Sequence, residues 1–482
     1  MIRKTTWLLF GRVTSDGLAF LFYISLARTF GQSGIGDYAF AFALASLFVL
    51  GVEFGLRPLI TRDIARNPAL ANDYCGNLLF AQALLAIIVG LVLHLVSVTL
   101  GYSGQMCFLV AMAFIGVALK TIGVSFVAFL EAIEAMDKSA IIEIIARLTI
   151  VAFGLALILA GVELRIVMIA HVIGGAAYLG LALYWVKQHF GLSRSKISLG
   201  FIKKTLHLAL PFAGASALYI LYSRIDLMMI HHFIGEEETG LYAVAFRSVE
   251  APLVVPLLVG VALYPVLSRA YDQGETERNQ LFLSTLKWLG ILGMAGAVTL
   301  ISIGDRLVVM LFGQEFVKSG ILTRWMAILL FIGFVKVPYW RLLLAMNHEH
   351  TQLRIQGLSV GLNLIFNILL IPKWGAFGAV WASIISEAFL AAGLHLSCAR
   401  LVAARYIAMA SRLLLIGGVS AALGIFLREF LSWPIVAGVA VATFMIAAVT
   451  FRLISAEDRR RFTFGINRLY FKTVGGVDGY IQ

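Results

Sequence analysis

The sequence predicts an all-α integral membrane protein of about 14 transmembrane helices, built as two parallel six-helix lobes around a central cavity plus two extra C-terminal helices. Composition is the first reason, because 61% of the 482 residues are hydrophobic and only 13% are charged, whereas a soluble domain holds about 45–50% apolar residues. The second reason is that apolar segments of about 20 residues recur along the chain, each long enough to cross a hydrocarbon core of about 30 Å as a helix. The third is a short motif that occurs once in each half of the chain.

Hydropathy, which averages +0.93 over the chain, predicts the positions of the helices when it is scanned in windows of about 19 residues. The strands of a membrane barrel would instead show alternating stretches of about ten residues. The basic N-terminus resembles that of a signal peptide, but no small-residue cleavage site follows it, so we expect a retained first helix. The predicted spans are 7–29, 37–56, 76–98, 106–128, 140–160, 164–186, 206–233, 241–267, 281–303, 321–345, 353–371, 375–397, 410–427 and 434–453.

Membrane orientation explains the net charge of +12, because Lys and Arg are spread over many short loops and a tail rather than gathered on one face that could bind nucleic acid. If the N-terminus is cytoplasmic, the segments on that side contain Arg3 and Lys4; Arg57, Arg62 and Arg66; Lys187, Arg194, Lys196, Lys203 and Lys204; Arg269 and Arg278; Arg400, Arg405 and Arg412; and the tail Arg459, Arg460, Arg461, Arg468 and Lys472. The opposite loops contain only Arg165, Arg306, Lys318, Lys373 and Arg428, together with the acidic GEEET at 235–239. Because cytoplasmic loops carry the excess of Lys and Arg, we expect both termini in the cytoplasm.

The segment FGQSGIGDYAFAF at 30–42 returns as IGEEETGLYAVAF at 234–246, an offset of 204. The identical pairs are Gly31/Gly235, Gly36/Gly240, Tyr38/Tyr242, Ala39/Ala243, Ala41/Ala245 and Phe42/Phe246. Chance similarity between apolar helices is the alternative, but the matches include polar and glycine positions. An even number of spans separates the copies, so the halves should run in the same direction, as in two-lobed transporters. The predicted domains are an N-lobe at 1–195, a C-lobe at 196–400, and the last two helices with a basic cytoplasmic tail at 401–482.

Several function classes lack the motifs that they require. There is no G-x-x-x-x-G-K-[ST] and no soluble stretch long enough for a nucleotide-binding domain, so we expect no ATP hydrolysis. H-E-x-x-H, G-x-S-x-G and Cys/His metal clusters are also absent, and Cys75, Cys107 and Cys398 are expected to be free thiols. We therefore predict a transporter rather than an enzyme, without catalytic residues, metal or cofactor. Its energy would come from an ion gradient, the membrane potential or the substrate gradient.

Ionisable residues lie within the predicted helices, where facing lipid costs about 2.5–3.5 kcal/mol, so we expect them to face a cavity or one another. Arg224 and Asp226 are two residues apart and point to different faces of one helix, so at least one needs another helix or water. Glu143 and Arg147 are four apart, near the cytoplasmic end of their helix. The predicted cavity cations are Arg12, Lys120, Arg224, Arg247, Lys336 and Arg341. The acidic candidates are Asp16, Asp226, Glu250 and Glu53.

This excess of cations suits an anionic substrate. Phosphate or diphosphate fits, because guanidinium groups bind it bidentately and a water-poor cavity strengthens the attraction. The acidic residues are candidates for coupling transport to a proton or sodium gradient. The competing interpretation is that many of these charges are structural ion pairs between helices.

The segment LARTFGQSGIGDYAFAFALASLFVLGVEFGLRPLITRDIARNP at 26–68 resembles the N-terminal helix pair of the polysaccharide-transporter family, the Wzx-type flippases of lipid-linked oligosaccharides. The residues that carry the resemblance are Gly31, Gly36, Tyr38, Ala39, Phe54, Gly55, Leu56 and Arg62. Two later segments are also similar to the family: DRLVVMLFGQEFVKSGILTRWMA at 305–327, and LNLIFNILLIPKWGAFGAVWASIISE at 362–387 with Asn367, Pro372, Gly375, Gly378 and Ala379. The wider multidrug/oligosaccharidyl-lipid/polysaccharide exporter superfamily shares the two-lobed bundle.

The resemblance implies a flippase that moves a polyprenyl-diphosphate-linked oligosaccharide, such as an O-antigen or other surface polysaccharide repeat unit, across the bacterial cytoplasmic (inner) membrane by alternating access. Its partners would be the lipid-linked glycan, membrane lipids and polysaccharide assembly proteins, and not nucleic acid. A small-molecule or drug exporter and a lipid II flippase are alternatives within the superfamily. A membrane glycan polymerase is a remote alternative, because the longest outer loop, at about 304–320, is too short for a catalytic domain.

Overall fold

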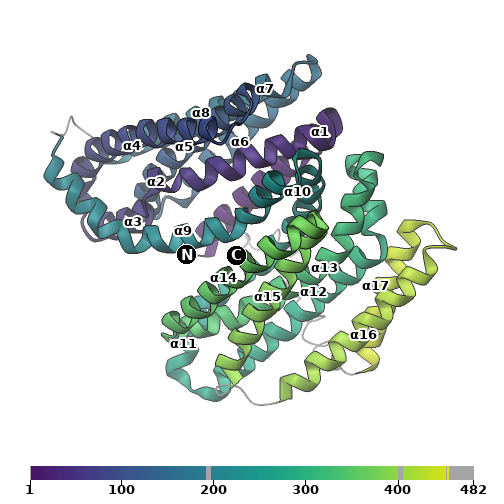
Figure 1. Cartoon of the computed structure of the whole chain (residues 1–482). Coiled ribbons are helices and arrows are strands. Elements are labelled where there is room, and N and C mark those ends of the chain that lie inside the picture. The colour runs from purple at the N-terminus through teal and green to yellow at the C-terminus, as the bar shows by residue number, and fades with distance from the viewer. Residues whose placement is uncertain (1, 192–196, 400–404, 452, 455–482) are drawn as a thin grey trace, which may run out of the picture. The chain divides into compact units, whose positions relative to one another are not determined.

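The computed structural model describes residues 2–191, 197–399, 405–451 and 453–454, and every regular element among them is a helix (Figure 1). Some of the basic residues predicted to be cytoplasmic fall elsewhere in the chain. Outside the described residues lie Arg194, Lys196, Arg400, Arg459, Arg460, Arg461, Arg468 and Lys472, and the side chains of Arg3, Lys4 and Arg405 also lie outside the description.

The first group of helices contains a kink between the predicted spans at 7–29 and 37–56. The elements are α1 (Ile2–Phe48), α2 (Leu50–Glu53), α3 (Leu56–Arg66), η1 (Pro68–Leu70), α4 (Ala71–Thr99), α5 (Gly104–Ala132), α6 (Met136–Leu159), α7 (Leu164–Val167) and α8 (Ile169–Phe190). Within α1, Gly31 has a φ of 66° and a ψ of −166°, which interrupts the helix. Glycine adopts this conformation without the steric penalty that a Cβ would bring.

The remaining helices begin at Leu199. They are α9 (Leu199–Phe233), α10 (Glu236–Glu250), η2 (Ala251–Leu253), α11 (Val254–Gln273), α12 (Glu275–Phe312), η3 (Gln314–Phe316), α13 (Val317–Ala345), α14 (Glu349–Trp374), α15 (Ala376–Ala399), α16 (Arg405–Leu427) and α17 (Trp433–Thr450).

Twelve helical stretches of the described residues are long and apolar enough to cross a membrane. One of them, Val13–Arg66, covers the predicted span at 37–56 and residues 13–29 of the predicted span at 7–29, which lie on either side of Gly31. Helix α9 contains the predicted span at 206–233. The prediction of an all-α, multi-pass membrane protein is confirmed.

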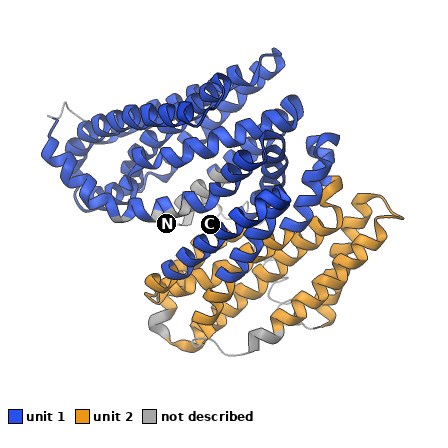
Figure 2. Cartoon of the chain, in the orientation of Figure 1, with its two compact units in different colours: residues 1–254, 307–326, 353–390 blue, residues 255–306, 327–352, 391–482 orange. Residues whose placement is uncertain are grey.

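The chain divides into two compact units, drawn in different colours in Figure 2. Unit 1 consists of Met1–Val254, Leu307–Met326 and Leu353–Leu390. Unit 2 consists of Val255–Arg306, Ala327–Gln352 and Ala391–Gln482. The domain limits predicted from the repeat, at 195 and 400, stay a prediction.

In unit 1, α1 packs against α5, α6 and α10, and α8 packs against α5 and α6. Glycines allow α5 and α8 to approach closely, since a Cβ added at Gly116 would lie 2.9 Å from the carbonyl carbon of His171. Gly175 faces the backbone of Gly116 in return. Close packing at small residues associates helices in a membrane, where lipid removes the hydrophobic force between them. This contact holds His171 against the interior of the unit.

In unit 2, α16 and α17 pack against each other and against α12. The buried interface includes Val298 of α12, Ile416 of α16 and Phe444 of α17. Arg428, just after α16, has its Nη2 atom 2.6 Å from Oδ2 of Asp305 on α12. Apolar packing and one ion pair therefore attach the last two helices to α12.

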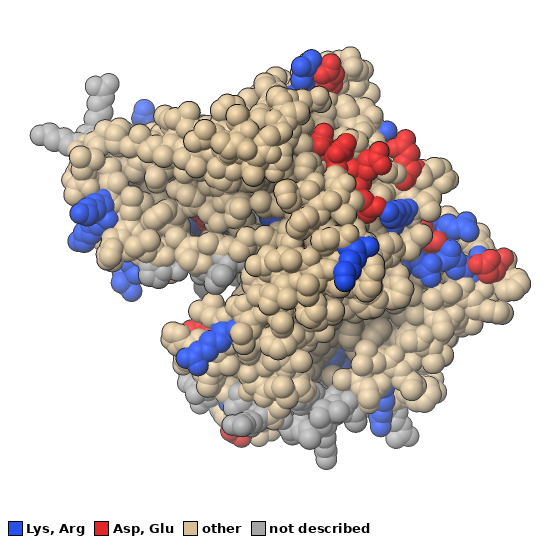
Figure 3. Space-filling view, in the orientation of Figure 1, with Lys and Arg blue, Asp and Glu red and all other residues tan. Residues whose placement is uncertain are grey.

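The face of the protein in view in Figure 3 is largely without charge. Figure 3 shows Lys, Arg, Asp and Glu gathered in a few places on the face in view, with most of that face formed by other residues. Helix α4 exposes Ile87, Leu91 and Leu95 by 62%, 66% and 62%. Such faces are stable in hydrocarbon, where apolar side chains lose nothing by exposure and charges are costly.

Candidate functional site

A cavity of about 390 Å³ lies within unit 1, among α1, α5, α6, α8, α9 and α10. Both copies of the repeat contribute to its wall. Tyr38 and Phe42 come from the first copy, and Ala243 and Phe246 come from the second. The cavity therefore lies where the two copies face each other.

Six ionisable side chains other than histidine and tyrosine line the cavity. They are Lys120 of α5, Glu143 and Arg147 of α6, Arg224 of α9, and Arg247 and Glu250 of α10. Four of these are cations and two are carboxylates, so the cavity has a formal excess of two positive charges. In a membrane-embedded wall, this excess favours an anion in the cavity.

On one side of the cavity, Glu143 is shared by two cations. Its Oε1 atom lies 2.8 Å from Lys120 Nζ and 3.9 Å from Arg147 Nη2. The Lys120 ammonium also lies 5.3 Å from the centre of the Tyr178 ring. Glu143 thus neutralises one of the two cations and leaves the other for a ligand.

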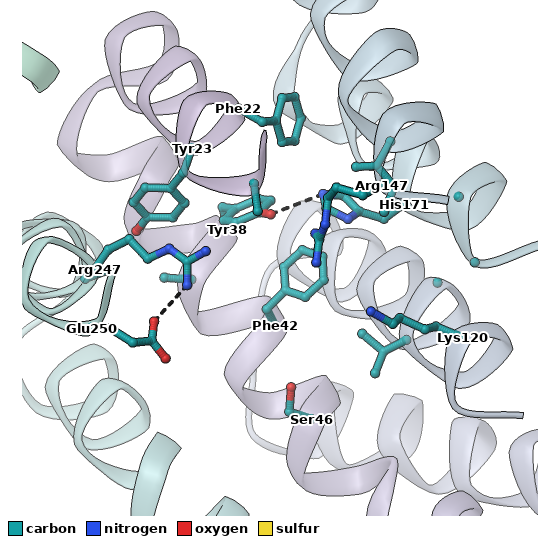
Figure 4. A pocket seen from close by; sticks show the side chains of 18 of the residues that line it. Phe22, Tyr23, Tyr38, Phe42, Ser46, Lys120, Arg147, His171, Arg247 and Glu250 are labelled. Atoms are coloured by element: carbon teal, nitrogen blue, oxygen red, sulfur yellow. Dashed lines mark hydrogen bonds and ion pairs between the residues drawn. The ribbon is translucent and has the colours of Figure 1, made fainter. Parts of the chain in front are cut away.

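On the other side, Arg247 and Glu250 pair along α10, with Nη1 and Oε2 2.7 Å apart (Figure 4). The Arg247 guanidinium lies 6.0 Å from the centre of the Tyr23 ring, and its Nε atom has no hydrogen-bond partner among the described residues. Arg224 lines the same cavity and forms no ion pair with any residue that the structure describes. Arg224 is therefore available to an anion, whereas the Nε atom of Arg247 is buried.

Aromatic rings and a histidine form a further wall. The Tyr38 hydroxyl lies 3.1 Å from Nε2 of His171, and the His171 ring is 4.6 Å from the Phe42 ring in an edge-on arrangement (Figure 4). Phe22 and Tyr23 of α1 also line the cavity. Aromatic side chains with a polar tip offer an apolar face and a hydrogen-bonding group together, so this wall can contact a ring-shaped, hydroxylated ligand.

Asp226 lies on the same helix as Arg224 but is buried, in agreement with the two-residue spacing. Its Oδ2 atom accepts hydrogen bonds from the Tyr242 hydroxyl at 2.7 Å and the Ser383 hydroxyl at 2.8 Å. Its Oδ1 atom accepts one from Asn367 Nδ2 at 2.6 Å. Asp226 therefore joins four helices, α9, α10, α14 and α15, through neutral donors.

The structure brings together four of the residues predicted from sequence, Lys120, Arg224, Arg247 and Glu250. Asp226 is in the buried cluster instead. The remaining candidates are placed as follows: the side chain of Arg12 lies outside the described part of α1; Asp16 is exposed on α1; Glu53 is half-buried in α2; and Lys336 and Arg341 are on α13 in unit 2, outside the lining of this cavity. Whether each of these residues binds substrate or ion stays a prediction.

Sequence reasoning missed several residues of the cavity wall. Glu143 and Arg147 carried a signal, because charges four residues apart share one face of a helix, but their place near a helix end favoured the cytoplasmic surface. Tyr38 was noted only as part of the repeat and of the family resemblance. His171 had no signal, since a single histidine in an apolar span becomes part of a site only when α8 is packed against α1.

Two family models match the chain. The model described as "Polysaccharide biosynthesis protein" matches residues 1–271, and the model described as "MatE" matches residues 211–369. Among curated proteins, the "Probable low-salt glycan biosynthesis flippase Agl15" of Haloferax volcanii is 22% identical, over 80% of this chain and 81% of that protein. The "Capsular polysaccharide biosynthesis protein CapF" of Staphylococcus aureus is 21% identical, over 80% of this chain and 96% of that protein.

Solved structures share the fold at low sequence identity. The lipid II flippase MurJ in an inward closed conformation gives a TM-score of 0.74 at 13% identity, over 92% of this chain and 98% of that one. An inward-facing multidrug resistance MATE family transporter of the MOP superfamily gives a TM-score of 0.58 at 16% identity, over 81% of this chain and 94% of that one. Together with the family model, which covers residues 1–271 and thus more than half of the 482 residues, these findings place the protein: the chain belongs to the polysaccharide biosynthesis protein family.

Proposed function

We propose that the protein is a flippase that moves a polyprenyl-diphosphate-linked oligosaccharide across the bacterial cytoplasmic membrane by alternating access. The cargo would be the repeat unit of an O-antigen or another surface polysaccharide. Membership of the polysaccharide biosynthesis family supports this substrate class, as does the similarity to proteins named as a glycan biosynthesis flippase and a capsular polysaccharide biosynthesis protein. The fold shared with MurJ and MATE transporters supports transport rather than catalysis.

The observation that carries the proposal is the charge of the cavity. Its formal excess of two positive charges matches a diphosphate esterified at both ends, which has one negative charge on each phosphate. Arg224 has no ion-pair partner among the described residues, and guanidinium groups bind phosphate oxygens bidentately. The first sugar would pack on the wall formed by Tyr38, Phe42 and His171, while the polyprenyl chain stays in lipid.

The orientation in the membrane is part of the same proposal. Both termini would lie in the cytoplasm, because the basic loops predicted for that side outweigh those on the other. The junction between α9 and α10 at Gly235 and the kink at Gly31 would then lie on the extracytoplasmic side. The lipid-linked glycan would enter from the cytoplasmic leaflet and leave on the opposite side.

The proposed function is tested by removing charge from the cavity in cells that lack their own copy of the gene. Arg224→Ala and Arg247→Ala should each lower surface glycan about 10–100-fold at unchanged protein level, since a hydrogen bond to a charged group contributes about 1.5–3 kcal/mol. Arg224→Lys should retain part of the activity because it keeps the charge. Arg165→Gln, at an exposed ion pair with Glu163, is the matched control and should export normally. Normal export by the Arg224→Ala, Arg247→Ala double variant would refute the assignment.

We also propose that Asp226 couples transport to a proton or sodium gradient. The support is its environment: a buried carboxylate that accepts three hydrogen bonds from neutral donors and has no cationic partner within 4 Å among the described residues. A buried carboxylate in this setting gains from binding a proton or a metal cation. Glu250 is a weaker candidate because Arg247 already compensates its charge.

The coupling proposal is tested in proteoliposomes with an imposed pH gradient or an imposed sodium gradient. One of the two gradients should accelerate transport, and Asp226→Asn should abolish that acceleration. Asp137→Asn, at a half-exposed position, is the control and should respond like the unmodified protein. Equal responses of Asp226→Asn and the unmodified protein would exclude Asp226 as the coupling residue.

A small-molecule exporter is the second candidate, because the MatE model matches residues 211–369. A cationic drug would meet a cavity of its own charge sign, which opposes its entry. We therefore expect no efflux of cationic dyes from cells that produce the protein, and strong efflux would favour this alternative. Lipid II has the same diphosphate headgroup, and rescue of cells that lack their own lipid II flippase would identify it as the cargo.

A further inference from the structure

The two copies of the repeat contact each other at one end of the cavity. A Cβ added at Gly36 would lie 2.8 Å from the carbonyl carbon of Glu236, and one added at Gly240 would lie 2.9 Å from the carbonyl carbon of Gln32. Gly36 and Gly240 are equivalent positions of the repeat, and so are Gln32 and Glu236, each pair 204 residues apart. We name this contact between the two copies the repeat contact. It has a two-fold pattern, because the glycine of each copy faces the equivalent backbone position of the other copy.

The repeat contact bounds the cavity. Tyr38 follows Gly36 by two residues on α1, Ala243 follows Gly240 by three residues on α10, and both line the cavity. At a rise of about 1.5 Å per residue, the lining begins within about 5 Å of the contact. For the cavity to open at this end, the two copies must separate.

One polar pair departs from the two-fold pattern. Nε2 of His231, at the end of α9, lies 3.7 Å from Oδ1 of Asp37 on α1. The equivalent positions, 204 residues away, hold Ala27 and Leu241. Ala27 and Leu241 are exposed by 0% and 4%. Buried apolar side chains therefore stand at the two positions that are equivalent to His231 and Asp37. Packing of the repeat therefore does not require a charged pair.

His231 is held in place but lacks a hydrogen bond at Nε2. Its ring stacks on Phe40 at 3.7 Å and an interplanar angle of 13°, and the Tyr102 ring meets it edge-on at 6.4 Å. The Nε2 atom is buried and has no hydrogen-bond partner among the described residues. The titratable groups on the surrounding elements are Asp37 on α1, Tyr102 between α4 and α5, Glu236, Glu237 and Glu238 in the first turn of α10, and His232 on α9 itself.

We propose that His231 and Asp37 form a proton-operated latch on the repeat contact. An imidazole gains a proton between about pH 8 and pH 5. When it is neutral, the His231 ring contributes packing but no ion pair. When it is protonated, it becomes a cation beside a carboxylate in a partly buried place, where a small shift completes a charge-assisted hydrogen bond. The latch holds the repeat contact closed at acid pH and weakens it at alkaline pH.

This inference rests on the proposed alternating access and concerns its regulation rather than its cargo. The test therefore measures opening without any glycan. Ser46, which lines the cavity, is replaced by Ser46→Cys in a background with Cys75→Ala, Cys107→Ala and Cys398→Ala. A membrane-impermeant maleimide is added outside intact cells at pH 5.5 and pH 8.0. The labelling rate is divided by that of an exposed control, Glu163→Cys, to remove the effect of pH on thiol reactivity.

The latch predicts that this normalised rate is about 10-fold higher at pH 8.0 than at pH 5.5. His231→Gln and Asp37→Asn should each remove the pH dependence and keep the rate high, whereas His231→Lys, with a permanent charge, should keep it low at both values. The matched control is His232→Gln, the exposed neighbour on the same helix, which should retain the pH dependence.

Three results would overturn the latch. The first is a labelling rate that keeps its pH dependence in both His231→Gln and Asp37→Asn. The second is an equal labelling rate at the two pH values in the Ser46→Cys protein that retains His231 and Asp37. Labelling of Glu163→Cys only from the cytoplasmic side would also overturn it, since the latch is assigned to the outer side. If the labelling rate depends on pH but the Arg224→Ala, Arg247→Ala double variant exports glycan normally, the latch is supported and the proposed cargo is refuted.

Discussion

At the scale of single residues, Glu143 sets the charge of the cavity. It is one of two carboxylates in the wall, and both Lys120 and Arg147 lie within 4 Å of its Oε1 atom. It therefore lowers the attraction of the cavity for an anion. A weaker attraction for the anion helps a carrier to release its cargo.

Glu143→Gln should tighten the binding of a short-chain polyprenyl diphosphate to the purified protein by about 5-fold. The change removes one of the two negative charges in the wall, and a half-exposed charge contributes about 1 kcal/mol. Isothermal titration calorimetry in detergent measures the affinity. The control is Glu163→Gln, which removes an equal charge at an exposed pair outside the cavity. Weaker binding in Glu143→Gln would mean that Glu143 positions Lys120 for the ligand.

Asp226→Leu should destabilise the protein by about 3–5 kcal/mol. The substitution leaves the Tyr242, Ser383 and Asn367 donors buried without the acceptor that now satisfies all three, and each unsatisfied buried group costs about 1–3 kcal/mol. Thermal unfolding in detergent measures the loss, and Asp226→Asn should lose less because it keeps one acceptor oxygen. Equal stability of Asp226→Leu and the unmodified protein would show that the cluster is dispensable for folding.

At the scale of elements, the close approach of α5 and α8 determines where His171 lies. Gly175→Leu should separate the two helices, because its side chain would meet the backbone of Gly116. Overpacking of this kind costs about 1–3 kcal/mol. Gly180→Leu on the same helix is the matched control, since nothing lies within 4 Å of a Cβ there. The two variants should differ in thermal stability, and identical melting curves would contradict the glycine contact.

The last two helices provide a second test at this scale. Arg428 and Asp305 form an ion pair at 2.6 Å with both side chains mostly buried, so a double-mutant cycle of Arg428→Gln and Asp305→Asn should give a coupling free energy of about 1 kcal/mol. Unfolding of the purified protein in denaturant measures it. Additive effects of the two substitutions would show that apolar packing alone attaches α16 and α17 to α12.

At the scale of the whole molecule, the distribution of basic residues predicts how the chain sits in the membrane. A fluorescent protein fused after residue 482 should be fluorescent, and alkaline phosphatase fused there should be inactive, because both report a cytoplasmic location of the C-terminus. Alkaline phosphatase inserted between α9, which ends at Phe233, and α10, which begins at Glu236, should be active. The reverse pattern would contradict the orientation that the positive-inside rule predicts.

Much of the fold and part of the site follow from sequence for identifiable reasons. Apolar length determines a membrane helix, so most helices of the structure correspond to predicted spans. A charge within such a span is costly unless it faces a cavity or a partner, and this reasoning found Lys120, Arg224 and Arg247. The sequence cannot distinguish a charge in a cavity wall from a charge in a buried hydrogen-bonded cluster. For this reason Asp226 and Glu250 were predicted together as acidic candidates.

By itself, the sequence determined that the chain is a helical membrane protein with a repeated motif and with more cations than anions inside its helices. These properties depend on composition, length and spacing along one helix, which are local. Only the tertiary structure decided that Glu143, Arg147 and His171 share a cavity with Arg224, and that His231 meets Asp37 across the repeat. Those contacts join helices that are far apart in sequence, and glycines such as Gly116 and Gly36 permit them through backbone approach, which no linear pattern encodes.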